Sequence, residues 1–248
     1  MKVVVAHLYP AYLNIYADRG NLAVLTGRAQ RRGIDLDVRE IGLGDATPAD
    51  ADLFYIGGGQ DREQALIAPD LAARSPALSE AVAGSAVLLA VCGGYQLLGR
   101  YYRDRSGFEQ PGADVLPLHT VAGDVRLIGD VLIECELDPG ERWTVVGFEN
   151  HAGRTILDEG ALPLGRVVAG FGNDGRSGFE GCRLGNAIGT YLHGPLLPRN
   201  PRLADWLLAR AVEHRTGALP VFEPLPDGVE REAHAVASAR ARSRGGRP

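Results

Sequence analysis

A cysteine stands between an apolar run and a pair of glycines in the stretch LLAVCGGYQLLG, Leu88 to Gly99. The apolar run is typical of a buried strand, and two glycines permit a sharp turn from a strand into a helix. A thiol on such a turn would be exposed at the start of the helix, where the helix dipole favours the thiolate. The pattern therefore predicts that Cys92 is a nucleophile; a buried structural cysteine is the alternative.

Acyl transfer by a thiol also needs a base. His193, in GTYLHGP, ends a predicted strand and precedes a Gly-Pro break. We expect it at the same sheet edge as Cys92, because ligands collect where parallel strands end. His151, in GFENHAG, competes with His193 on spacing alone, and His7 at the end of the first predicted strand could approach the same edge.

A glycine-rich loop could supply the third part of such a site, the hydrogen-bond donors for an oxyanion. The segment GGGQD, Gly57 to Asp61, follows a short apolar run that is typical of a strand. Backbone N–H groups of this loop, together with that of Gly93, could converge on a developing negative charge. A flexible loop with no catalytic part is the plainer interpretation of a lone glycine triplet.

The elements that must position these residues alternate in the first half of the chain. Apolar patterning predicts strands at Lys2–His7 and Ile34–Ile41 and two more that end at the glycine loop and at Cys92. Helices are expected at Asn21–Arg32 and Glu63–Ala83. Alternating strands and helices indicate an α/β fold with a flavodoxin-like, doubly wound, mainly parallel sheet.

The second half has a different pattern. Between Val115 and Leu192 strand-like segments follow one another, which predicts an antiparallel extension of the sheet. An amphipathic helix is expected at Pro201–Gly217, with proline at its start and glycine at its end. We expect one domain over residues 1–220. Residues 221–248 are rich in Pro, Ala and Arg and are expected to form a mobile tail.

Composition limits the class of protein. The 248 residues are 45% hydrophobic and carry a formal net charge of −5, which gives no basic field for nucleic acid or an anionic membrane. No segment approaches the ~18 apolar residues of a membrane span, and the N-terminus lacks a signal-peptide pattern. Three cysteines without CxxC spacing indicate reduced thiols in the cytoplasm rather than a disulfide framework or a zinc site.

Taken together, YIGGGQD, AVCGGYQLLG and GTYLHGP occur in the order found in class I glutamine amidotransferases, which the chain resembles. Ala90 is a mild departure, since many members have glycine there. GFENHAGRT and GNAIGTYLHG are similar to the cobyric-acid-synthase-like branch. LYPAYLNIYADRGN, Leu8 to Asn21, is similar to the glutaminase subunits of lipid II isoglutaminyl synthases. The resemblance covers roughly Lys2 to Arg210 and leaves the tail outside.

The resemblance implies a class I glutamine amidotransferase fold and a role for each motif. Cys92 would attack the side-chain carboxamide of L-glutamine, with His193 as the base and then as the acid toward departing ammonia. A γ-glutamyl thioester would form and be hydrolysed. The oxyanion would be held by backbone N–H groups near Gly58, Gly59 and Gly93.

Two further side chains are candidates for holding glutamine. Gln96 and Arg126 could bind its polar ends, and the planar fork of an arginine suits a carboxylate. A surface ion pair is the alternative for Arg126. Many class I members place a glutamate two residues after the catalytic histidine, but here Pro195 stands there. His193 could therefore act in a dyad, be oriented by a carboxylate elsewhere such as Glu149, or receive one from a partner.

The implied partner is a MurT-like synthetase subunit of the Mur-ligase family. That subunit would use ATP and magnesium to activate the D-glutamate of lipid II, while this chain has no phosphate loop, no metal cluster and no cofactor expected of its own. The expected assembly is a cytoplasmic heterodimer that contacts the membrane only through lipid II. Three alternatives remain: a glutaminase for amidation of a corrinoid precursor, a cysteine hydrolase on the same fold, and a catalytically silent binding partner that retains the fold.

Overall fold

The computed structural model of the chain describes residues 1–14 and 19–244. Residues 15–18, which belong to the expected motif Leu8–Asn21, and residues 245–248 of the expected tail lie outside the described residues. None of the helices in the described part has the length and apolar character needed to cross a membrane.

The first sheet carries the ends of the strands that matter for the site. Its order is β11-β12-β4-β3-β1-β2. The five strands from β12 to β2 are parallel, and β11 is an antiparallel edge strand. Their bounds are β1 Lys2–Leu8, β2 Asp35–Ile41, β3 Leu53–Ile56, β4 Val87–Val91, β11 Cys182–Leu184 and β12 Ala187–Thr190. The predicted parallel sheet is confirmed.

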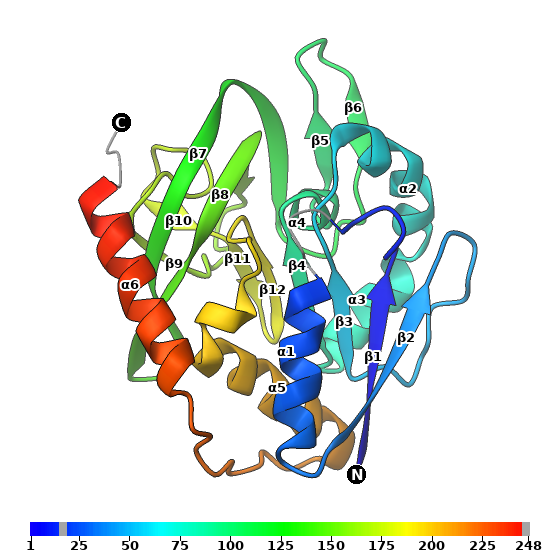
Figure 1. The fold of residues 1–248 in the computed structure, drawn as a ribbon. Helices are drawn as coiled ribbons and strands as arrows, with labels where there is room; N and C mark the ends of the chain where they lie inside the picture. Colours follow the sequence, from blue (N-terminus) through cyan, green and yellow to red (C-terminus); the bar gives the residue numbers. More distant parts are fainter. Residues whose placement is uncertain (15–18, 245–248) are drawn as a thin grey trace.

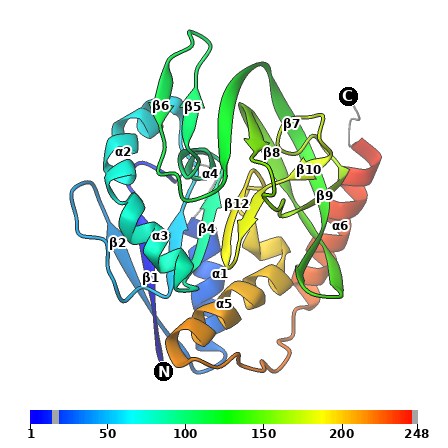
Figure 2. The same ribbon diagram turned by 180° about the vertical axis from the view of Figure 1, so that it is seen from behind.

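Helices cover both faces of this sheet (Figures 1 and 2). On one face lie α1 (Arg19–Gln30) and α5 (Pro201–Thr216), and on the other lie α2 (Asp61–Ala73) and α3 (Ser75–Ala83). Alternate residues of the buried strands pack into one core or the other, as the two-residue period of a strand requires. The sheet is therefore doubly wound.

The expected antiparallel extension is mostly a separate second sheet of order β10-β9-β7-β5-β6, with β8 paired to β7. Its strands are β5 Tyr101–Arg103, β6 Glu109–Pro111, β7 Leu118–Asp138, β8 Glu141–Leu157, β9 Gly165–Ala169 and β10 Phe179–Glu180. The two long strands β7 and β8 form a hairpin that arches beside the first sheet (Figure 1). Only β11 and β12 of this half join the first sheet.

The C-terminal segment differs from the expected mobile tail. Gly228–Arg244 forms helix α6, which packs against β7, β8 and β9. Ala237 and Ala241, one turn apart, are buried against this sheet, and Arg240 donates to Asp130 at 2.8 Å. Small alanines on one face let the helix approach closely while its arginines stay in solvent, which a composition argument does not detect.

Candidate active site

The backbone turns sharply at Cys92, between β4 and the short helix α4 (Gly93–Leu97). Cys92 has φ 53° and ψ −107°, a conformation that costs a non-glycine residue about 1–3 kcal/mol. Its side chain is partly exposed, whereas Cys135 and Cys182 are buried. The structure thus has the predicted turn. Helix α4 spans only five residues, so the expected contribution of a helix dipole to the thiolate is small.

Strand order brings three chain segments to one edge of the first sheet. Because β4 lies between β3 and β12, the ends of these strands are neighbours. The N–H of Cys92 donates to the carbonyl of Thr190 at 2.8 Å, and His193 follows three residues later. The glycine loop after β3 adjoins the same turn, since the N–H of Gly94 donates to the carbonyl of Gly57 at 3.2 Å.

The glycines of the turn have no room for a side chain. A Cβ on Gly93 would lie 2.8 Å from Nε2 of Gln64 and 3.0 Å from the backbone nitrogen of Gly59. Nε2 of Gln64 in turn donates to the carbonyl of Gly59 at 3.1 Å, which fixes the loop. The backbones of Gly59 and Gly93 therefore approach each other closely, as a shared anion-binding position requires.

A cavity of about 660 Å³ opens over this turn. Five of the seven predicted site residues line it: Gly58, Gly59, Cys92, Gln96 and Arg126. The other two are not among the lining residues that the structure describes: Gly93 lies within the turn and His193 is buried.

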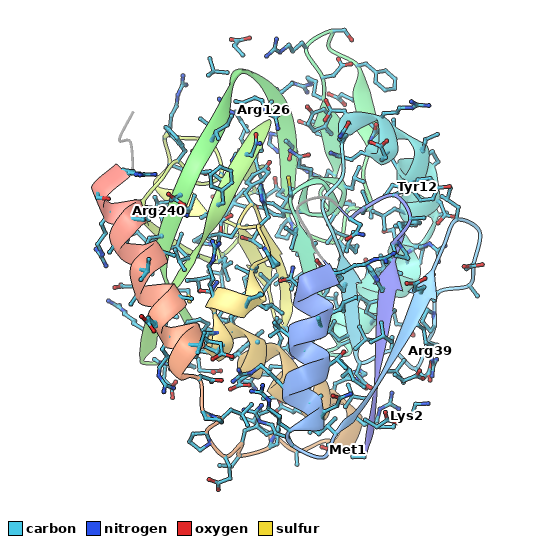
Figure 3. All side chains as sticks on the ribbon, in the orientation of Figure 1. Met1, Lys2, Tyr12, Arg39, Arg126 and Arg240 are labelled. Carbon is cyan, nitrogen blue, oxygen red and sulfur yellow. The ribbon has the colours of Figure 1, made fainter. Side chains whose placement is uncertain are left out.

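The two side chains predicted to hold glutamine face the cavity from different elements. Gln96 is 5% exposed, and its Nε2 donates to the hydroxyl of Tyr191 at 3.1 Å. Arg126 comes from β7 (Figure 3). It lies in the irregular stretch where the pairing of β7 with β8 shifts register. Its Nε donates to Oδ1 of Asn150 at 2.9 Å, so Arg126 is attached to β8 rather than to a surface carboxylate.

His193 sits beneath the cavity and pairs with β8. Its N–H donates to the carbonyl of Phe148 at 3.0 Å, and the N–H of Phe148 donates back at 3.1 Å. The pKa of His193 is lowered to about 4, mainly by burial and to a smaller extent by His151 and Arg126. The imidazole is therefore neutral at pH 7, which is the form that accepts a proton.

Glu149 and His151 lie next to this pairing on β8 and are both buried. Glu149 accepts backbone N–H groups from Phe171 at 2.7 Å and Gly172 at 2.9 Å. Nε2 of His151 lies 3.6 Å from Oε2 of Glu149. His151 also lines the cavity, so the competing histidine of the sequence belongs to the site as well.

Among the lining residues that sequence reasoning missed are Gln64, Tyr102 and Asn150. Asn150 stands inside the quoted motif GFENHAGRT, so that motif contained a signal for it. Gln64 lies on α2 and Tyr102 on β5, where no local pattern sets them apart. In the described part of the chain no group of three or more His, Cys, Asp or Glu residues could hold a metal ion.

The arrangement has the parts that acyl transfer by a thiol requires. A partly exposed thiol, a neutral imidazole and closely spaced backbone N–H groups meet at one strand edge beside a cavity.

Comparison with known proteins gives the family. Residues 4–201 match the CobB/CobQ-like glutamine amidotransferase domain. The chain is 40% identical over 235 residues to the GatD subunit of the glutamine-hydrolysing lipid II isoglutaminyl synthase of Staphylococcus aureus, covering 94% of this chain and 93% of the relative. For the GatD subunit of Streptococcus pneumoniae the identity is 40% over 226 residues, with coverage of 89% and 86%.

A solved structure agrees on the fold. The structure of PurLQS from Thermotoga maritima has a TM-score of 0.56 at 16% identity, covering 86% of this chain and 96% of that chain.

The match to the S. aureus subunit includes part of the C-terminal segment. It leaves about 6% of the 248 residues unmatched, which is roughly 15 residues, whereas the segment 221–248 has 28. The likeness therefore extends past Arg210 into the C-terminal segment. The chain belongs to the CobB/CobQ-like glutamine amidotransferase family, with the GatD subunits of lipid II isoglutaminyl synthase among its relatives.

Proposed function

We propose that the chain is the glutaminase subunit of a lipid II isoglutaminyl synthase. The observation that carries this proposal is the 40% identity to the S. aureus subunit across nearly the whole of both chains. Because the two chains match over nearly their whole length, we favour lipid II over a corrinoid precursor as the final acceptor.

The reaction begins with attack by the sulfur of Cys92 on the side-chain carbonyl carbon of L-glutamine. The thiol proton passes to the neutral imidazole of His193, and the tetrahedral oxyanion is held by backbone N–H groups near Gly58, Gly59 and Gly93. Collapse breaks the C–N bond, and His193 returns the proton to the departing ammonia. Water then hydrolyses the γ-glutamyl thioester to glutamate and restores the thiol.

Two side chains that line the cavity, Arg126 and Gln96, would bind glutamine. Arg126 suits the α-carboxylate, because its guanidinium can donate two parallel hydrogen bonds. The side chain of Gln96, held by Tyr191, is placed to contact the other polar end of the substrate. The cavity beside Cys92 has a volume of about 660 Å³, which is enough for a free amino acid. This volume supports a small substrate rather than a protein chain.

The ammonia would pass to a MurT-like subunit of the Mur-ligase family in a cytoplasmic heterodimer. With ATP and magnesium bound to that partner, the D-glutamate carboxylate of lipid II is activated, and ammonia converts it to D-isoglutamine. A partner carboxylate beside His193 would raise the low pKa of this imidazole, since an opposite charge favours the protonated form. Formation of the complex would then increase glutamine turnover.

The test uses amide-¹⁵N glutamine, lipid II, ATP and the chain together with a MurT-like subunit. We expect ¹⁵N in the D-isoglutamine of the product, and none when Cys92→Ala replaces the wild type. Ammonium chloride supplied to the Cys92→Ala complex should restore amidation, because the synthetase does not need this thiol. Amidation that proceeds from glutamine without Cys92 would refute the proposal. Labelling of Cys92 by a glutamine analogue separates this activity from that of a general cysteine hydrolase.

A further inference from the structure

The segment that follows β1 has no part in the proposed reaction, although it contacts the glycine loop. It begins the motif Leu8–Asn21 and runs past α2 (Figure 1). A Cβ on Gly59 would lie 2.3 Å from Cδ2 of Leu13 and 3.4 Å from the carbonyl oxygen of Tyr12. Leu13 is completely buried among core side chains, which are packed too closely for it to move aside. Leu13 therefore limits where the backbone of Gly59 can lie.

Gly59 also contacts the turn that carries Cys92. A Cβ on Gly93 would lie 3.0 Å from the backbone nitrogen of Gly59, which is one of the groups that the proposed reaction needs for the oxyanion. Such donors act only at about 2.7–3.1 Å from the developing charge. If Gly59 moved toward the space that Leu13 fills, its N–H would move away from Gly93. The distance between these donors therefore depends on the contact between Leu13 and Gly59.

A tight turn holds Leu13 in place. The N–H groups of Tyr12 and Leu13 both donate to the carbonyl of Tyr9, at 3.0 Å and 2.9 Å. Tyr9 has a φ of 57°, which is a strained conformation for a residue with a side chain. Such a conformation persists only where the surrounding contacts fix it. The position of Leu13 therefore depends on the contacts of Tyr9.

A network of hydrogen bonds fixes the side chain of Tyr9, which is completely buried. Its hydroxyl donates to Oδ2 of Asp70 at 2.6 Å and accepts from Nε of Arg74 at 2.8 Å. Nε of Arg74 also donates to Oδ2 of Asp70 at 2.7 Å, and its Nη2 donates to the carbonyl of Gly42 at 2.8 Å. Buried networks whose members are all hydrogen-bonded make their surroundings rigid. The network thus attaches Tyr9 both to α2 and to the chain that follows β2.

We propose that Leu13 is a positioning residue for the oxyanion donors, and that the Tyr9–Asp70–Arg74 network holds it against Gly59. Leu13 and Tyr9 are not among the cavity-lining residues in the described part of the chain, so they act through the N–H of Gly59. The inference rests on the proposed glutaminase function, because the oxyanion belongs to that reaction. Since the oxyanion forms only during the reaction, loss of this contact should lower kcat and leave the binding of glutamine unchanged.

A double-mutant cycle between positions 13 and 59 tests the contact. In Gly59→Ala the methyl group overlaps Leu13, and relief to an ordinary 3.4 Å requires a movement of about 1.1 Å, which should lower kcat about 100-fold. Leu13→Ala removes the support and should lower kcat about 10-fold, which is less than the ~100-fold cost of losing a whole donor. In the double variant the methyl group occupies the space that Leu13 leaves, so kcat should exceed that of Gly59→Ala. A double variant whose loss equals the product of the two single losses would overturn the proposal.

The affinity for glutamine separates positioning from general damage. In a Cys92→Ala background, Leu13→Ala should leave the calorimetric Kd of L-glutamine within about threefold, since an interaction made only in the transition state changes kcat and not binding. Leu25→Ala is the matched control, because Leu25 is a buried leucine of α1 in the other core. It should lower the Tm about as much as Leu13→Ala and leave kcat unchanged. Equal losses of kcat in the two variants would overturn the proposal.

Tyr9→Phe tests the network and suffices if Leu13→Ala does not fold, because it removes one hydroxyl and no core volume. We expect kcat to fall about fivefold, as a displacement of roughly 0.3–0.4 Å would cause. An unchanged kcat would overturn the role of the network.

An amide ¹⁵N spectrum of the chain alone distinguishes failure of this inference from failure of the proposed function. The resonance of Gly59 should move in Leu13→Ala and in Tyr9→Phe but not in Leu25→Ala, whether or not the chain hydrolyses glutamine. If the wild type hydrolyses glutamine and the resonance of Gly59 does not move in either variant, the inference alone is wrong. If the resonance moves but the wild type shows no hydrolysis with its partner, the proposed function is wrong, and the role of Leu13 in the reaction falls with it.

Discussion

An alanine at Gly94 would force the Cys92 turn away from the glycine loop. Its Cβ would lie 2.8 Å from the carbonyl oxygen of Gly57 and 2.6 Å from Cγ2 of Ile56. Ordinary contacts begin near 3.4 Å, so relief requires a movement of about 0.6–0.8 Å. The carbonyl cannot rotate away as a flexible side chain would, because it accepts the N–H of Gly94 itself.

This displacement has a calculable effect on rate and on stability. A misplacement of 1 Å can cost about 100-fold in rate, so 0.6–0.8 Å corresponds to a loss of roughly 15- to 40-fold in kcat/KM. Overpacking costs about 1–3 kcal/mol, and replacing a helical glycine by alanine returns about 0.5–1 kcal/mol. We expect a net loss of about 1 kcal/mol, and hence a fall in Tm of about 2–4 °C for a chain of this size.

Glutamate release and thermal unfolding measure the two effects separately. Gly27→Ala is the control, because it lies in α1 with no atom within 4 Å of an added Cβ. That change should raise stability by up to ~1 kcal/mol and leave the rate unchanged. Wild-type turnover in Gly94→Ala at an unchanged Tm would refute the close approach between the turn and the glycine loop.

Three further predictions follow from strain, charge and packing. Cys92→Gly should be more stable than Cys92→Ala by about 1 kcal/mol in the free energy of unfolding, because only glycine adopts a φ of 53° without strain. Calorimetry measures this difference, and equal stabilities would contradict the strained turn. The raised pKa of Glu180 means that its protonated form stabilises the fold below about pH 4.5 and that this contribution is lost as the pH rises through about 8. Denaturant titrations should therefore show that Glu180→Gln gains stability relative to the wild type as the pH rises from about 4.5 to about 8. A stability difference that does not change with pH would contradict the raised pKa of Glu180. Ala241→Glu should expose residues 228–244 to proteolysis, because Ala241 is fully buried, whereas Arg242→Glu should not; equal protection of both variants would contradict the packing of α6.

The parallel sheet and the Cys92 turn could be predicted because their signals are local. Three of the four predicted strands are followed directly by a glycine or by Cys92, which marks where they end, and short crossovers leave few ways to arrange the strands. The second sheet could not be separated from the first, since the pairing of β7 with β8 and the insertion of β12 beside β4 depend on contacts far apart in sequence.

The candidate site was predictable to the same extent. Cys92 and His193 stand at strand ends, and that position alone predicted one sheet edge for both. The link between Glu149 and His151 has no local signature, because any alternating strand places two such residues on one face. Their place near His193 follows only from the pairing of Phe148 on β8 with His193, which the sequence does not show. Helix α6 was missed because alanine contributes little to an apolar pattern, even where Ala241 is completely buried.

The measurement that tests the central claim most directly is glutamine hydrolysis by this chain, alone and with a MurT-like subunit, for wild type and Cys92→Ala. We predict hydrolysis that requires Cys92 and rises when the partner is added. Absence of hydrolysis in both settings, with Cys92 also unreactive toward glutamine analogues, would contradict the account, and the turn at Cys92 would then serve the fold alone.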